Sequence, residues 1–154
     1  MLEKKRNILL LLLLLVASRA GYAAERSHHP HHVAAATGYS WHGNEESVYA
    51  GVDYVYSFQN GFTVGAFIED VRGDFDLQAV GVLFGKKWSN GFSLSAGPGV
   101  EYKIKKDKHL FLVRATAAYN WHFSNWSIGP IFSYDAIEDA SNATYLGIAV
   151  GYGF

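Results

Sequence analysis

The chain has 154 residues, which suggests a single domain, and its formal net charge is −1. It contains no cysteine, which excludes a disulfide framework and a lipidated N-terminal cysteine. After position 23 the chain carries nine basic and 13 acidic side chains, so the basic surface of a nucleic-acid-binding protein is not expected.

The first 23 residues have the pattern of a secretory signal peptide. Basic residues at positions 4–6 precede an apolar run at 8–17, and Gly21-Tyr22-Ala23 is a small-x-small cleavage site. A helix of ten apolar residues is too short to span a bilayer, which takes about 20. We therefore predict a signal peptide at 1–23, a histidine-rich leader at 24–32 and one folded domain at 33–154. A short N-terminal anchor is the alternative.

Beyond the leader, apolar side chains alternate with small or polar ones along almost the whole chain. The run 47–58 places Val48, Val52 and Tyr54 on one face and Gly51 and Asp53 on the other. Such alternation is typical of β-strands, and Asn-Gly pairs such as 60–61 are strong hairpin signals. Eight strands are predicted, at 33–42, 47–58, 62–69, 77–88, 92–104, 110–121, 126–134 and 144–154.

The predicted connections alternate between tight turns and longer polar segments. Tight turns are expected at 59–61, 89–91 and 122–125, and longer loops at 43–46, 70–76, 105–109 and 135–143. Short turns at one end and longer loops at the other are typical of an all-β, eight-stranded, antiparallel up-and-down transmembrane β-barrel. A soluble barrel also alternates, but its apolar face points inward, and this apolar face is too bulky for a lumen of eight strands.

Aromatic residues with outward parity gather beside the tight turns. Such a ring of aromatics is typical of a membrane interface and has no purpose in a soluble barrel. The predicted aromatic girdle consists of Phe58, Phe62, Trp88, Phe92, Trp121, Trp126 and Phe154.

These features together resemble the small eight-stranded outer-membrane proteins of Gram-negative bacteria, of the OmpX-like and OmpA-barrel type. The resemblance implies an outer-membrane location, periplasmic termini, contacts with outer-membrane lipid and lipopolysaccharide, and recognition of Phe154 by the barrel-assembly machinery. The stretches GVDYVY (51–56), GDFD (73–76) and GPGVE (97–101) are similar to a group of uncharacterised small barrels. We expect a monomeric, non-enzymatic protein with a structural, envelope or surface-interaction role.

Four charged residues have inward parity and lie at similar heights. We predict a cluster of Arg114 with Asp53, Glu69 and Glu101, with Gly99 opposite Arg114 leaving space for the guanidinium. Buried charges persist only when they are paired, so the cluster is interpreted as a structural plug. A narrow pore for ions or small solutes is the alternative.

Four histidines lie within five residues of the leader. His28, His29, His31 and His32 have imidazoles that bind Zn, Cu or Ni. No second group of ligands accompanies them, so a flexible polar leader without a cofactor is the preferred interpretation.

His122 and Ser124 have the His-x-Ser spacing of an outer-membrane lipid A 3-O-deacylase, which is also an eight-stranded barrel. The resemblance implies that His122 would be the base and Ser124 the nucleophile. In that family the pair precedes the last strand, whereas two strands follow it here. The candidate carboxylates, Asp135 and Glu138, are expected in a loop at the opposite end, so a polar turn is the preferred interpretation.

A lysine-rich segment follows the fifth predicted strand. Lys105, Lys106 and Lys108, with Lys103 beside them, are candidates for contact with lipopolysaccharide phosphates. A solvated loop is the alternative.

Overall fold

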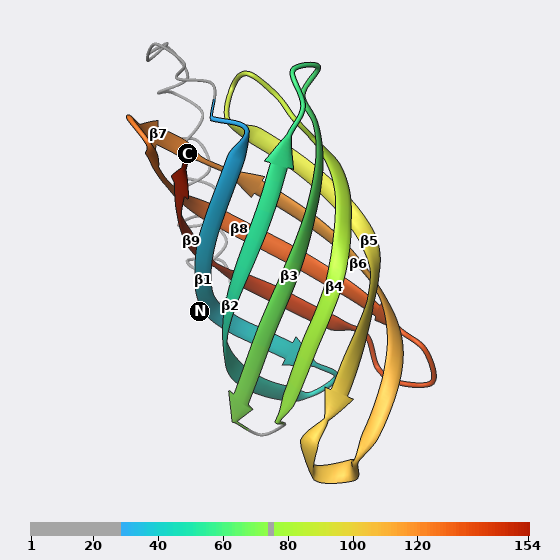
Figure 1. Ribbon diagram of the computed structural model, residues 1–154. Coiled ribbons are helices and arrows are strands. Elements are labelled where there is room, and N and C mark those ends of the chain that lie inside the picture. The colour runs from blue at the N-terminus through green and yellow to red at the C-terminus, as the bar shows by residue number, and fades with distance from the viewer. Residues whose placement is uncertain (1–28, 74–75) are drawn as a thin grey trace, which may run out of the picture.

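The computed structural model describes residues 29–73 and 76–154, in which antiparallel strands form a closed barrel (Figure 1). The strands are β1 (His31–His42), β2 (Glu45–Ser57), β3 (Phe62–Gly73), β4 (Leu77–Lys87), β5 (Phe92–Lys103), β6 (Lys108–Tyr119), β7 (Trp121–Phe123), β8 (Trp126–Ile137) and β9 (Ala143–Gly153). A single turn of 3-10 helix, η1 (Ile104–Lys106), links β5 to β6. Each strand pairs with the next along the chain, except that β6 pairs with β8 instead of β7, and β9 pairs back with β1.

Nine strand segments supply eight positions in the wall. The three residues of β7 continue the line of β6, and both segments pair with β8. Asn120 separates them, and its backbone N–H donates to the carbonyl of Gly91 in the neighbouring turn (2.9 Å). The predicted eight-stranded antiparallel barrel is confirmed. Among the described residues no helix is both long and apolar enough to span a bilayer.

The two ends of the barrel differ. The connections 58–61, 88–91 and 124–125 define the tight-turn end, at the top of Figure 1, and the chain ends there at Phe154. Backbone hydrogen bonds in both directions join His31 to Phe154. The opposite end, here the loop end, carries the connections from β1 to β2, β3 to β4, β5 to β6 and β8 to β9.

The strands at the loop end are longer than the sequence predicts. The expected loops 43–46, 70–76 and 135–143 were too long, because β2 begins at Glu45, β3 runs to Gly73 and β8 runs to Ile137. Polar side chains do not stop a ladder, because the hydrogen bonds are made by the backbone of each residue. Only Gly43 and Asn44 separate β1 from β2, and Gly43 has a φ of 64°, which glycine adopts without strain.

Side chains divide between the two faces as the alternation predicts. Outward residues such as Val48, Ile68, Val80 and Ile148 are about half exposed. Inward residues are buried in the half of the barrel near the loops and partly buried toward the tight turns, and the lumen is less polar than expected. A cluster of large side chains fills it, which includes Tyr49, Phe67, Leu112 and Tyr145.

All seven residues of the aromatic girdle lie at the tight-turn end. Five have more than a third of their surface exposed, and Phe92 and Trp121 are half-buried. Phe123 in β7 is a further exposed ring at this end, at 62%. The rings contact one another in pairs, such as Trp88 with Phe92 at 5.6 Å.

Candidate functional site

Arg114 lies at the centre of the lumen and joins opposite walls of the barrel. Its guanidinium donates two hydrogen bonds to Glu69 on β3 (both 3.0 Å) and two to Asp135 on β8 (both 2.7 Å). The same group stacks on Phe67 (4.1 Å) and Tyr145 (4.8 Å). Two bidentate carboxylate pairs and two rings therefore hold one cation across the barrel.

Glycines on β4 and β5 make room for this arrangement. A Cβ added at Gly81 would lie 2.5 Å from the Phe67 ring, and one at Gly99 would lie 3.1 Å from it. Only residues without a side chain at these positions let Phe67 lie flat beneath Arg114. The residue opposite Arg114 on β5 is Gly97, so the predicted pairing with Gly99 was wrong by two positions.

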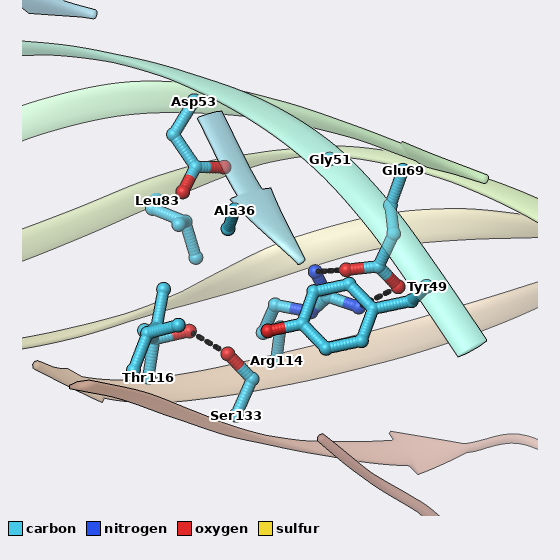
Figure 2. Close-up of a pocket in the computed structure, with 10 residues that line it drawn as sticks. Ala36, Tyr49, Gly51, Asp53, Glu69, Leu83, Arg114, Thr116 and Ser133 are labelled. Atoms are coloured by element: carbon cyan, nitrogen blue, oxygen red, sulfur yellow. Dashed lines mark hydrogen bonds and ion pairs between the residues drawn. The ribbon is translucent and has the colours of Figure 1, made fainter. Parts of the chain in front are cut away.

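The structure brings together part of the predicted charge cluster. Glu69 pairs with Arg114, whereas Glu101 is fully buried and forms its ion pair with Lys103, at 3.6 Å. Asp53 points into a cavity beside Arg114, and no hydrogen bond joins the two (Figure 2). The second partner of Arg114 is Asp135, which the sequence analysis placed in a loop.

Asp135 could have been found by extending the alternation of β8. Ser127, Gly129, Ile131 and Ser133 have inward parity, and the next position of that parity is 135. The polar run that starts at Asp135 was interpreted as the loop, although its first three residues belong to the strand.

A small cavity borders the cluster on the side of the tight turns. Its volume is about 20 Å³, room for about one water molecule. Asp53, Leu83 and Ile131 contribute to its lining, and Thr116 and Ser133 hydrogen-bond to each other there (2.9 Å; Figure 2). On the side of the loops the lumen is filled by buried apolar residues, which are Val71, Leu77, Leu110, Leu112 and Ile137.

His122 and Ser124 lie at the tight-turn end, away from Asp135. The His122 Nε2 contacts the Lys87 ammonium (3.0 Å), and the Ser124 hydroxyl donates to the Asn125 side chain (3.1 Å). His122 pairs with Ser127 on β8, eight residues from Asp135, which corresponds to about 26 Å along a strand. Asp135 therefore cannot orient His122, and Glu138 lies three residues further away.

The described histidines of the leader point to different sides of the barrel wall. His31 and His32 belong to β1, so the barrel starts two residues earlier than predicted. His31 stacks on Phe154 (5.4 Å) and contacts the Tyr54 hydroxyl, whereas His32 contacts Ser127 in the lumen (2.9 Å). His28 lies outside the described residues. Within residues 29–73 and 76–154 no group of three or more His, Asp or Glu is placed to hold a metal ion. Metal binding by the tract stays a prediction.

The lysine-rich segment is exposed at the loop end. Lys105 forms an ion pair with Asp76 on the adjacent connection (3.3 Å). The hydrogen bond that the Lys105 ammonium donates in this pair lowers the pKa of Asp76. Lys106 and Lys108 are exposed, and Lys103 is drawn toward the lumen by Glu101. Lys105 and its neighbours therefore form a basic rim on one side of the barrel.

A closed eight-stranded barrel with an apolar outer face and a filled lumen has the architecture of the small outer-membrane barrels. The neisserial surface protein A (NspA) aligns over 80% of this chain and 96% of its own with a TM-score of 0.60 and 10% identity. Ail of Yersinia pestis aligns over 80% and 99% with a TM-score of 0.52 and 17% identity. A designed transmembrane β-barrel aligns over 83% and 99% with a TM-score of 0.54 and 16% identity. At these identities the likeness concerns the fold. No protein-family model and no curated protein sequence matches the chain.

Proposed function

We propose that this protein is a non-enzymatic outer-membrane barrel whose sealed body holds short loops at the cell surface. The observation that carries the proposal is Arg114, fixed by Glu69 and Asp135 across the lumen. The guanidinium is bound by carboxylates halfway along the barrel, and buried apolar residues fill the lumen between it and the loops. This arrangement suits a rigid plug better than a pore.

The tight-turn end would face the periplasm, because transmembrane barrels of this class have short periplasmic turns and longer external loops. Because the chain contains no cysteine, single cysteines can be introduced to test this orientation directly. In intact cells, a cysteine introduced as Ser141→Cys should react with a membrane-impermeant maleimide, and one introduced as Asn60→Cys should react only after the outer membrane is opened. The reverse pattern would overturn the orientation, and recovery of both proteins outside the outer-membrane fraction would overturn the location.

The lipid A deacylase alternative requires a carboxylate that orients His122, and the candidates Asp135 and Glu138 lie toward the opposite end of the barrel. Mass spectrometry of lipid A from cells that express the wild type or His122→Ala should give the same acylation pattern. A 3-O-deacylated species present only with the wild type would replace the structural proposal by the enzymatic one.

The basic rim supports a second element of the proposal, contact with lipopolysaccharide phosphates. Lys106 and Lys108 are exposed, and together with Lys105 they would meet phosphates as point charges. The triple variant Lys105→Gln, Lys106→Gln, Lys108→Gln should retain less lipopolysaccharide on purification at low salt. Arg72→Gln, which removes an exposed cation at the same end that is already paired with Asp70, is the control. Equal retention of lipopolysaccharide by the wild type, the triple variant and the control would contradict this part of the proposal.

A further inference from the structure

Charged side chains are rare on the outward face of the barrel. Among the described residues, four outward strand positions carry Asp, Glu, Lys or Arg. Glu46, Asp70 and Arg72 lie near the loop end, and Lys86 alone lies in the half that ends in the tight turns. Asp70 and Arg72 neutralise each other through two hydrogen bonds (2.7 and 3.0 Å). Lys86 is therefore the isolated charge of this surface.

The surroundings of Lys86 are apolar and aromatic. Its ammonium lies 5.5 Å from the Phe62 ring and 5.9 Å from the Trp88 ring. Its neighbours across the two ladders are Phe62 on β3 and Leu94 on β5, both about half exposed. No ion pair joins Lys86 to any carboxylate in residues 29–73 and 76–154.

The position of Lys86 along β4 fixes the depth of its charge. Its Cα lies two residues from Trp88, about 7 Å further along the tilted strand toward the middle of the membrane. A bare ammonium at that depth is unfavourable, so the side chain extends toward the interface, as its contacts with both rings indicate. Tryptophan is enriched where lipid headgroups meet the acyl chains, so the ammonium arrives at the level of the headgroup phosphates.

We propose that Lys86, Phe62 and Trp88 form a binding site for the headgroup phosphate of a glycerophospholipid in the leaflet at the tight-turn end, with a preference for anionic headgroups. The ammonium donates hydrogen bonds to the phosphate, the two rings hold the ammonium in place, and Phe84 and Leu94 contact the acyl chain. An anionic lipid is preferred because a zwitterionic headgroup brings its own cation to the same phosphate. The site requires the membrane location proposed above.

Quenching of tryptophan fluorescence by brominated lipids measures this preference locally. A variant that keeps only Trp88 (Trp41→Phe, Trp121→Phe, Trp126→Phe) is refolded into vesicles of phosphatidylcholine and phosphatidylglycerol, with one or the other lipid brominated. We expect a relative binding constant for phosphatidylglycerol about fivefold above that for phosphatidylcholine at low salt. The value should fall to about one in Lys86→Gln and partly recover in Lys86→Arg.

A variant that keeps only Trp126, on β8, tests whether the lipid preference is local to Lys86. Trp126 should report no preference for phosphatidylglycerol, whether residue 86 is lysine or glutamine. The inference is overturned if Lys86→Gln leaves the preference at Trp88 unchanged, or if Trp126 reports the same preference. If a tryptophan variant fails to refold, native mass spectrometry of the wild type and Lys86→Gln decides by the number of phosphatidylglycerol molecules retained. A wild-type chain that does not fold into vesicles at all would instead contradict the membrane location.

Discussion

At the residue scale, Arg114 is the cation that joins the two walls at the centre of the lumen. Arg114 is 4% exposed, and its partners Glu69 and Asp135 are 6% and 0% exposed. Removing one member of a buried, hydrogen-bonded set leaves charges without partners in a medium that solvates them poorly. The energetic effect of a substitution should therefore depend on whether the residue belongs to the bonded set, rather than on its charge alone.

Arg114→Ala should lower the free energy of unfolding by about 3–5 kcal/mol, because two buried carboxylates lose their counter-ion. Urea titration in lipid vesicles, followed by the shift between folded and unfolded bands on gels, measures the change. Arg72→Ala is the control, since Arg72 is exposed and pairs with Asp70 at the rim, and its midpoint should match the wild type. An unchanged midpoint for Arg114→Ala would contradict the role of the cluster.

Substitutions of different acidic residues in the lumen should have different effects on the free energy of unfolding in the same assay. Asp135→Asn should lower the free energy of unfolding by about 3 kcal/mol, because Asp135 accepts two 2.7 Å bonds from Arg114. Asp53→Asn should change it by less than about 1 kcal/mol, because Asp53 faces the cavity without a bonded cation. Equal effects of the two substitutions would mean that net charge, and not pairing, determines the stability of the lumen.

At the element scale, the existence and faces of the strands could be predicted because one side of every strand meets an apolar environment. The ends of the strands and the register between them could not be predicted. In a hairpin the register follows from the position and length of the turn, and the turn between β5 and β6 lies at 104–107 rather than at the predicted 105–109. This is why Gly97 rather than Gly99 lies opposite Arg114. Asp135 was assigned to a loop because the polar residues at the end of β8 hide how far the strand runs.

The same limit applies to the candidate site. Inward parity identified Arg114 and Glu69 from the sequence, because a period of two assigns each residue to a face. Which acids reach the guanidinium depends on heights that differ by a few residues between strands. Asp53 and Glu101 share the parity, but Asp53 lies toward the tight turns and Glu101 toward the loops, so parity alone could not separate them from Asp135.

β9 provides a prediction at this scale. If Phe154 is the signal for barrel assembly, Phe154→Ala should reduce the amount of folded protein in the outer membrane of cells by severalfold. Refolding of the purified chain in detergent should change little, because the ring is 55% exposed. Phe123→Ala, which removes a 62% exposed ring at the same end, is the control. Equal loss of folded protein with both variants would contradict a special role of Phe154 in assembly and would leave it as an ordinary girdle residue.

At the scale of the whole molecule, the filled lumen predicts an impermeable barrel. Eight strands enclose little more than packed side chains, and here those side chains include the Arg114 cluster and the apolar residues beside it. Planar bilayers that contain the refolded protein should show no conductance above baseline at any ionic strength. Reproducible ion-selective steps that vanish in Asp53→Asn would instead support the narrow pore.

The pairing of β1 with β9 determines the order in which the barrel can form. His32 and Gly153 are neighbours in the sheet but lie 121 positions apart in the chain. All other ladders join strands that follow closely in sequence, so they can assemble as successive hairpins, whereas this one must wait for the last strand and close the longest loop. Non-local pairing of this kind is slow, and until it happens two strand edges remain open to pairing with other chains. The barrel is thus a structure whose first and last strands must be protected between synthesis and closure, and its folding rate should be governed by that single step.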